Sequence, residues 1–371
     1  SADLDENATI FPMLAIEEPE AHLHPALQYK LLKYLQERVR QEASNRQIFI
    51  TTHSTQITAA VGLDPLIVFS VDDASQSVKV AYPGKVFGDS SSDKESKAYV
   101  ERYLDATKSN MLFSKGVIFV EGLAEQILIP CLAEYNGTPL EDNYIAIIGV
   151  GGSTFKHFLP LFGAVEDKER QKFAMNNVKV SLILDADPCH KKKPAPGEKA
   201  RWKTCYPFEI GSKPVEYEYK AVSSVVDNLR EKSKNALNIG KPFHGVKTLE
   251  FDLGFLNFPN PVILQPIEEE KRNALLGLGR VPTPSAIPLP AGWQSESGEE
   301  IYERHNQIPF SDPREKARAL FASLFLNEAE GGKGEFAFFL EKSLRGNLDP
   351  EKKTSSFIFS VPKYIPYLPL G

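Results

Sequence analysis

The chain has 371 residues, of which 42% are hydrophobic, and a formal net charge of −6 at pH 7. This length allows two or more domains with real cores. The negative charge argues against a protein that coats DNA through its overall charge. No stretch resembles a signal peptide or a membrane span, and the three cysteines show no motif spacing. We therefore expect a protein of the reducing cytoplasm with no membrane partner.

An apolar segment near the start of the chain, residues 11–16, runs into Glu17 and Glu18, a proline and a polar loop. This segment resembles the Walker B strand of ABC-type ATPases. The resemblance implies that Glu17 helps to hold Mg²⁺, at a position that is usually aspartate, and that Glu18 polarises the attacking water.

The next segments predict a helix over 26–42, from leucines at three- and four-residue spacing, and a strand that begins at 47 and runs into Thr-Thr-His-Ser. His53 resembles the switch histidine that senses the γ-phosphate of ATP. The alternatives for it are an ordinary histidine or, with His22 and His24, a zinc ligand, although no cysteine lies near.

A phosphate-binding loop of the form Gly-x₄-Gly-Lys-[Ser/Thr] is absent from the sequence. We therefore expect residues 1–81 to be the second half of an ABC-type ATPase domain, taken from a longer polypeptide or incompletely given, that cannot hold a triphosphate alone. A decayed ATPase lobe that serves as a scaffold is the alternative. Short strands near 66–71 and 77–81 end this part, and a polar connector over 82–114 includes a helix within 93–110.

Two carboxylate clusters stand where apolar runs stop: Glu121 with Glu125, and Asp185 with Asp187. Strands that end in acids place them at the carboxyl edge of a parallel sheet, where open α/β sheets have their sites. Gathered carboxylates raise each other's pKa unless cations neutralise them, and Mg²⁺ prefers oxygen ligands. For the glutamates alone a solvated helix face is the simpler interpretation, and the aspartates point the same way only if strand geometry persists through them.

The surrounding pattern is α/β, with apolar strands and amphipathic helices in alternation, which favours a parallel sheet with right-handed crossovers. We expect strands at 116–120, 144–148, 178–184 and 246–251, and helices at 123–134 and 154–165. The glycines in 149–152 fail the dinucleotide-binding spacing and are interpreted as tight packing beside the acidic site.

Val120-Glu121-Gly122 with Glu125, and Leu184-Asp185-Ala186-Asp187, resemble the Toprim signature. Toprim domains occur in topoisomerases, primases and several nucleases, where these acids bind divalent metal for phosphoryl transfer on nucleic acid. An ABC-like ATPase followed by Toprim resembles the OLD (overcoming lysogenisation defect) family of nucleases. In that family the segment matching 247–253 implies a further acidic ligand at Glu250, and the segment matching 331–337 implies a basic catalytic residue at Lys333.

The resemblance places the Toprim domain at 115–253, with an insertion at 188–245, and a helical and tail region at 254–371 that completes the nuclease. Within the insertion we expect a helix over 217–237, and after it helices at 266–276, 312–325 and 334–345, a Pro-rich loop over 281–293 and a Pro-punctuated tail over 361–367. The alternatives for Glu250 and Lys333 are a plain strand-edge acid and a lysine in a Gly-rich helix start.

A basic run in the insertion directly follows the aspartates. It is either a solvated loop or a loop that grips DNA phosphates, and its candidate residues are Lys191, Lys192, Lys193, Arg201 and Lys203.

The leading hypothesis is a DNA endonuclease that uses two Mg²⁺ or Mn²⁺ ions. Glu121 would act in catalysis and metal binding together with Glu125, Asp185, Asp187 and Glu250, and Lys333 would stabilise transition-state charge. The resemblance further implies control by ATP, a homodimer formed through the ATPase domain, a helicase-like partner and a role in phage defence. The rivals are an ATP-regulated DNA clamp without cleavage, and another Toprim enzyme such as a topoisomerase or primase.

Overall fold

The structure is a computed structural model that describes residues 13–41, 47–72, 75–194, 199–236, 238–280 and 289–365. The start of the first predicted strand, residue 42 of the first predicted helix, residue 237 and most of the Pro-rich loop lie outside these ranges, as do positions 366 and 367 of the tail. The chain divides into two compact units: unit 1 is 1–115, 156–178 and 235–238, and unit 2 is the remainder. Among the described residues, no helix is long and apolar enough to cross a membrane.

Unit 1 begins with a two-stranded parallel sheet, β1 (Met13–Glu17) and β2 (Gln47–Thr51), joined by helix α1 (Pro25–Gln41). Helix α2 (Thr55–Val61) follows at once, because the Ser54 hydroxyl accepts a hydrogen bond from the Ile57 amide at 3.2 Å and caps its first turn. The spacing of the leucines therefore predicted α1 correctly, and the two apolar runs are the strands on either side of it.

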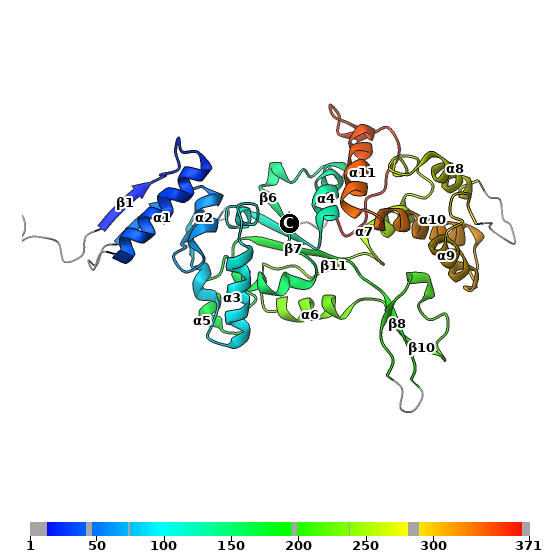
Figure 1. The fold of residues 1–371 in the computed structure, drawn as a ribbon, viewed down its shortest axis with the longest axis horizontal. Helices are drawn as coiled ribbons and strands as arrows, with labels where there is room; N and C mark the ends of the chain where they lie inside the picture. The colour runs from blue at the N-terminus through cyan, green and yellow to red at the C-terminus, as the bar shows by residue number, and fades with distance from the viewer. Residues whose placement is uncertain are drawn as a thin grey trace, which may run out of the picture. The chain divides into compact units, whose positions relative to one another are not determined.

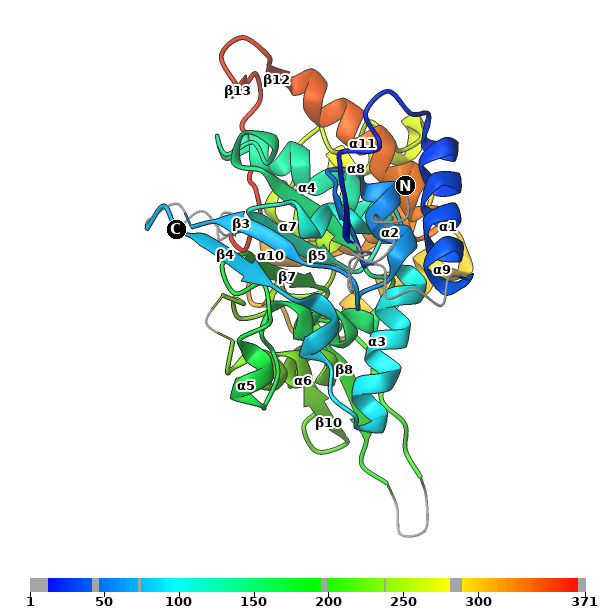
Figure 2. The same cartoon turned by 90° about the vertical axis from the view of Figure 1, so that its left-hand side faces the viewer.

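The rest of unit 1 is an antiparallel hairpin followed by helices (Figure 2). Its elements include β3 (Val68–Val71), β4 (Val78–Ala81), η1 (Pro83–Val86), α3 (Ser91–Tyr103), η2 (Lys108–Leu112) and α5 (Lys168–Gln171). Helix α3 starts where the Ser90 side chain accepts a hydrogen bond from the Asp93 amide. The connector helix thus lies earlier than expected.

Unit 2 contains a four-stranded parallel sheet in the order β11-β7-β5-β6, with strands β5 (Gly116–Val120), β6 (Ile145–Gly149), β7 (Lys179–Leu184) and β11 (Phe243–His244). Every residue of β5 is buried, as expected for the inner strand of a sheet covered on both faces. Helix α4 (Leu123–Tyr135) follows β5. The parallel sheet and three of its four strands agree with the expectation from sequence.

The fourth strand was predicted wrongly. Residues 246–251 do not form a strand, because the Thr248 hydroxyl accepts a hydrogen bond from the Phe251 amide at 3.3 Å and starts helix α7 (Leu249–Leu256). The strand that pairs with β7 is the shorter β11, a few residues earlier. A threonine cap followed by acids in the first turn is a helix start, and that signal outweighs the apolar composition.

Two predicted helices were also wrong in part. Residues 154–165 form two 3₁₀ turns, η4 (Ser153–His157) and η5 (Leu159–Phe162), and Pro160 stands inside the second. Residues 217–237 begin as strand β10 (Tyr217–Lys220) and only then form α6 (Ser224–Ser233). Tyr-Glu-Tyr-Lys alternates with a period of two, which is strand spacing.

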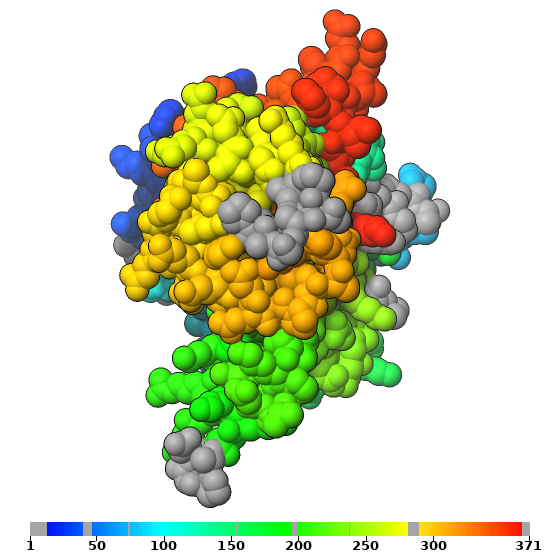
Figure 3. Space-filling model, turned by 90° about the vertical axis from the view of Figure 1, so that its right-hand side faces the viewer, coloured from blue at the N-terminus to red at the C-terminus, as the bar shows by residue number. Residues whose placement is uncertain are grey.

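The insertion therefore contains an antiparallel sheet that the sequence did not reveal. Its strand order is β10-β8-β9, with β8 (Cys189–Lys192) and β9 (Lys203–Thr204), and 3₁₀ turn η6 (Pro207–Glu209) follows. Figure 3 shows this part in green, with the helices that follow in yellow and orange above it.

The remaining helices of unit 2 build its largest core. They are α8 (Glu269–Leu278), α9 (Glu296–Asn306), α10 (Pro313–Glu330) and α11 (Lys333–Asn347), and a small hairpin, β12 (Leu348–Asp349) with β13 (Thr354–Ser355), follows them. Helix η3 (Glu141–Asn143) precedes β6. Helix α10 packs along α7, and α11 along α4 (Figure 1). The close α7–α10 approach uses Gly254, where an added Cβ would lie 3.2 Å from the Ala322 Cα.

His305 is a fully buried histidine in this core. Its Nδ1 lies 2.7 Å from the Ile301 carbonyl, its ring centroid is 4.2 Å from that of Phe208, and its Nε2 lies 3.3 Å from the Ser323 hydroxyl. Burial lowers the pKa of His305 to about 4, because an apolar site disfavours the charged ring.

We predict that His305 makes unit 2 less stable as the pH falls from 6.5 to 4. In this window the unfolded chain binds a proton that the folded chain does not, so the free energy of unfolding falls by up to about 1.4 kcal/mol per pH unit from this group. His305→Gln should reduce that slope. Both tryptophans of the chain, Trp202 and Trp293, lie in unit 2, so urea unfolding followed by tryptophan fluorescence measures it.

Lost packing in His305→Gln lowers the free energy of unfolding equally at every pH, so the value at pH 7.5 serves as the internal reference. Parallel pH curves for the wild type and the variant would contradict the prediction.

Candidate metal and phosphoryl-transfer site

Glu121 and Glu125 lie at the junction of β5 and α4. Glu121 is the first residue after the strand, and Glu125 is in the first turn of the helix. The Glu125 Oε2 accepts a hydrogen bond from the Gly122 amide at 3.0 Å, which caps the helix. The predicted helix start is therefore correct, and the cap fixes the Glu125 side chain beside Glu121.

Two glycines after β6 form hydrogen bonds with the Glu121 backbone. The amides of Gly151 and Gly152 both donate to the Glu121 carbonyl at 3.1 Å. Both glycines have positive φ, 74° and 67°, which favours glycine over residues with a side chain. Tight packing, which the sequence suggested for 149–152, is not the reason for these two glycines, because an added Cβ at either would meet no atom within 4 Å; it applies to Gly149, where a Cβ would lie 2.7 Å from the Gln126 side chain.

Asp185 and Asp187 follow β7, but not as a continued strand. The strand ends at Leu184, and Asp187 has φ 45°, in the left-handed region. The amides of Ala186 and Asp187 both donate hydrogen bonds to the carbonyl of Lys247, at 2.7 and 3.4 Å. The Asp185 Oδ1 accepts a hydrogen bond from the Leu249 amide at 3.3 Å. The chain leaves the sheet at this point and packs against the start of α7.

Glu250 lies in the first turn of α7 and is 2% exposed. Neither of its carboxylate oxygens has a hydrogen-bond partner among the described residues. A buried carboxylate without a partner is costly. It marks a place for a ligand that donates hydrogen bonds or carries positive charge.

Lys333 is the first residue of α11. A cation at a helix N-terminus is unfavourable for the helix dipole, and here acids offset that cost. Burial lowers the pKa of Lys333, but attraction to Glu250, Asp185 and Glu125 exceeds this effect and raises it. Gly334 next to it allows α11 to approach α4, because an added Cβ would lie 2.9 Å from the Leu123 side chain.

The carboxylates interact strongly with one another. Burial, with repulsion from Asp187 and Glu125, raises the pKa of Glu121 to about 7. Burial, then repulsion from Glu250, Glu125, Glu121 and Asp187, raises the pKa of Asp185 well above its usual value. For Glu125, burial and repulsion from Glu250 outweigh the helix-capping hydrogen bonds and raise the pKa. The structure thus brings together the acids and Lys333 from four separate stretches of sequence.

The donor chemistry of this acidic cluster fits hard divalent cations, since all its ligand atoms are carboxylate oxygens and the two oxygens of Glu250 are buried without partners. Within the described ranges, however, no three His, Cys, Asp or Glu side chains already form a group that could hold a metal ion. The backbone brings the acids near one another against their mutual repulsion, but the side chains are not closed around one point.

The ATPase-like residues lie together in unit 1. Glu17 ends β1, and Glu18 follows with φ 41°. The Glu18 Oε1 lies 3.4 Å from the His53 Nε2. The sequence missed Glu20, whose Oε1 accepts hydrogen bonds from the Thr52 hydroxyl and the His53 amide, both at 2.7 Å. Glu20 thereby fixes the loop that carries His53.

Two family models match the chain. Residues 3–58 match an AAA ATPase domain, and residues 112–187 match the overcoming lysogenization defect protein-like TOPRIM domain. The second match includes both acid pairs, Glu121 with Glu125 and Asp185 with Asp187.

The chain carries an OLD-like TOPRIM domain. It follows a segment of an AAA ATPase domain, in the order that the motifs indicated. Glu250 and Lys333 lie beyond the residues that the TOPRIM model matches.

Curated relatives include two proteins named endonuclease GajA from Bacillus cereus. The chain is 29% identical over 146 residues to that of strain VD045 and 23% identical over 156 residues to that of strain HuB5-5. The matches cover 39% and 38% of this chain and 23% of each relative. The chain thus spans about a quarter of the length of these relatives.

Similar solved structures include the C-terminal region of the Xanthomonas campestris pv. campestris OLD protein. The identity is 20% and the TM-score is 0.33, and the match covers 69% of this chain and 91% of that chain. The C-terminal region of the Burkholderia pseudomallei OLD protein gives 17% identity, a TM-score of 0.27, and coverage of 63% and 98%.

Sequence reasoning missed two polar groups beside the TOPRIM acids. Lys247 is 8% exposed, and its ammonium lies 3.3 Å from the Cys205 carbonyl and 4.9 Å from the centre of the Tyr206 ring. Burial lowers its pKa, although Asp187 opposes this. Asp252 accepts hydrogen bonds from the Val246 amide and, at 3.1 Å, from the Tyr364 hydroxyl. Both lie in the segment 247–253 that the sequence singled out for Glu250 alone, and only tertiary packing shows that they are buried beside the acids.

The basic run of the insertion is divided by the antiparallel sheet. Lys191 forms an ion pair with Glu218 at 3.0 Å, and Lys193 donates to the Pro214 carbonyl at 2.8 Å. Lys192, Arg201 and Lys203 are exposed and form no ion pair with another described residue.

We predict that Glu250→Gln stabilises the protein in EDTA. The change removes one buried, unpartnered charge from a cluster of like charges, which should raise the free energy of unfolding by about 1–3 kcal/mol. It should also reduce the rise in melting temperature that Mg²⁺ or Mn²⁺ produces, since it removes a ligand. Thermal unfolding with EDTA and with each ion measures both effects.

The matched control is Glu270→Gln, an exposed glutamate on α8, which should leave both values unchanged. A Glu250→Gln protein that is less stable in EDTA and keeps the full metal-induced rise would show that Glu250 is no ligand.

Proposed function

We propose that this chain supplies the nuclease part of a metal-dependent DNA endonuclease controlled by an ATPase domain. The observation that carries the proposal is the convergence of Glu121, Glu125, Asp185 and Glu250 on one another, with Lys333 beside them. The name of the two relatives, endonuclease GajA, supports it.

The residues that would hold divalent metal, Mg²⁺ or Mn²⁺, are Glu121, Glu125, Asp185, Asp187 and Glu250. When bound, two such ions supply an activated water and neutralise charge on the phosphate and leaving oxygens. The raised pKa values of Glu121 and Asp185 support this assignment, because they mean that the site gains free energy from added positive charge, in the form of protons or of cations.

The protein's own groups have separate tasks. The caps at Gly122 and Thr248 hold Glu125 and Glu250 on rigid helix starts, so little conformational entropy is lost when they close around a ligand. Lys333 is an exposed residue at the start of α11, and its ammonium is attracted towards the acids. It would bind a non-bridging phosphate oxygen and stabilise the charge that develops there.

For the ATPase part we propose that Glu17 binds the Mg²⁺ of ATP, that Glu18 polarises water and that His53 senses the γ-phosphate. The contact between Glu18 and His53 supports the last two roles, since both side chains must face one phosphate. ATP binding between two such domains would give a homodimer, and a helicase-like partner and a role in phage defence belong to the same proposal.

We predict that the 371-residue chain nicks or cuts plasmid DNA with Mg²⁺ or Mn²⁺ and that Asp185→Asn abolishes the activity. Lys333→Met should lower kcat by about 10²-fold or more with a smaller effect on KM, because the interaction is strongest in the transition state. Gel assays of supercoiled plasmid at several DNA concentrations measure both.

Lys342→Met is the control, since Lys342 is an exposed lysine on the same helix, α11. Intact nicking by Asp185→Asn would refute the assignment of the site. DNA binding without strand breaks under any divalent ion would favour a clamp instead, and covalent protein–DNA adducts would favour a topoisomerase.

A further inference from the structure

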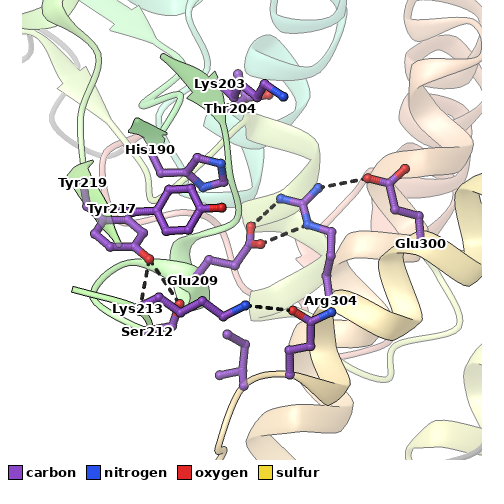
Figure 4. A pocket seen from close by; sticks show the side chains of 12 residues that line it. His190, Lys203, Thr204, Glu209, Ser212, Lys213, Tyr217, Tyr219, Glu300 and Arg304 are labelled. Carbon is purple, nitrogen blue, oxygen red and sulfur yellow. Dashed lines mark hydrogen bonds and ion pairs between the residues drawn. The ribbon is translucent and has the colours of Figure 1, made fainter. Parts of the chain in front are cut away.

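A cavity of about 610 Å³ lies in unit 2, between the antiparallel sheet of the insertion and the end of α9 (Figure 4). Its volume falls in the range of about 300–1,000 Å³ that is usual for small-molecule sites. The cleavage mechanism proposed above does not use it, and no family motif falls on its lining.

One wall of the cavity is aromatic. In the sheet register, His190 pairs with Tyr219 and Lys192 with Tyr217, so all four side chains lie on one face. The rings form a continuous patch, because the His190 centroid is 4.9 Å from that of Tyr217 and 6.2 Å from that of Tyr219. In Figure 4 the rings of His190 and Tyr217 face the interior. The Tyr219 hydroxyl is engaged, since it accepts a hydrogen bond from the Lys213 amide.

The opposite wall carries paired charge. Arg304 binds Glu209 through two nitrogens, with Nε at 3.0 Å from Oε1, and its guanidinium lies 4.7 Å from the centre of the Tyr206 ring. The Glu209 charge is therefore neutralised within the wall.

Two further cations at the cavity have no such partner. Lys213 donates to the neutral Gln307 Oε1 at 3.1 Å, and Lys203 is exposed on the same face as His190. Neither forms an ion pair with a described residue. The cavity thus combines stacking rings, hydrogen-bonding side chains and two available ammonium groups.

This combination fits one nucleotide. A base stacks on aromatic rings regardless of its identity, and ammonium groups bind the phosphate. The base must be unpaired, because the bases of a duplex present only their edges to a side chain.

The cavity is also close to the acidic cluster along the chain. His190 follows Asp187 by three residues, and the Cys205 amide donates to the Pro188 carbonyl at 2.8 Å, which ties the base of the sheet to the cluster. At about 3.3 Å per extended residue, the aromatic wall begins within about 10 Å of Asp187.

We propose that this cavity binds an unpaired nucleotide of the DNA strand to be cut, with the base on Tyr217 and His190 and its phosphate on Lys203 and Lys213. The inference rests on the proposed nuclease function and adds to it the substrate class: single-stranded or locally opened DNA.

The test measures binding and cleavage separately. Fluorescence anisotropy with Ca²⁺ follows a labelled oligothymidylate of about 12 nucleotides and a duplex of equal length. The wild type should bind the single strand more tightly than the duplex. Tyr217→Leu should weaken single-strand binding by about tenfold and change duplex binding little, whereas Tyr217→Phe should retain it. Lys220→Ala, on the same strand but the opposite face of the sheet, is the control and should have no effect.

Equal binding of single strand and duplex, or a Tyr217→Leu protein with wild-type affinity, would overturn the proposal even if plasmid cleavage occurs. Absence of cleavage with Tyr217-dependent single-strand binding would leave the cavity assigned and refute the nuclease function alone. Direct binding of a fluorescently labelled thymidine monophosphate, with no binding of the oligonucleotide, would identify a site for a free nucleotide and contradict the strand proposal.

Discussion

Mutual repulsion among buried and half-buried carboxylates is the constraint on which unit 2 depends. Repulsion makes the ionised state of the cluster unfavourable, and the cluster consists of Glu121, Glu125, Asp185 and Glu250. The raised pKa values of the first three show this cost. A fold that accepts this cost must hold the groups by other means. Buried β5, the α7–α10 packing and the α4–α11 packing supply that stability from apolar contacts.

The starts of three helices meet at the cluster, and each contributes one charged side chain. Glu125 is in the first turn of α4, Glu250 in that of α7, and Lys333 begins α11. The partial positive charge of a helix N-terminus favours the two acids and opposes the lysine. Lys333 remains there because its attraction to the acids is stronger than the unfavourable dipole. The same dipoles would favour a phosphate placed between them.

The insertion adds the proposed nucleotide-binding cavity to the acidic cluster. It leaves the parallel sheet immediately after Asp187, forms the antiparallel sheet of β8, β9 and β10, and returns through α6 to β11. One face of this small sheet contributes the aromatic wall of the cavity, while Lys191 and Lys220 on the other lie over Trp202, at 5.1 and 4.6 Å from the ring centre. Division of a basic run between two faces is a consequence of strand alternation, and a charge count along the sequence does not show it.

The sequence by itself determined the α/β class, the parallel sheet and the position of the acid pairs, because buried strands that end in acids are local patterns. Its motifs resembled an ABC-type ATPase segment followed by a Toprim domain, and the family models match an AAA ATPase segment before a TOPRIM domain. The sequence did not determine the helix start at Thr248 or the strand at Tyr217, where capping and two-residue alternation compete with apolar composition. Only the tertiary structure decided that Glu250 is buried without a partner, that Lys247 and Tyr364 lie beside the acids and that His190 and Tyr217 form one wall. Burial and contacts of this kind depend on how separate elements pack, and no local pattern within one element shows which neighbours a side chain meets.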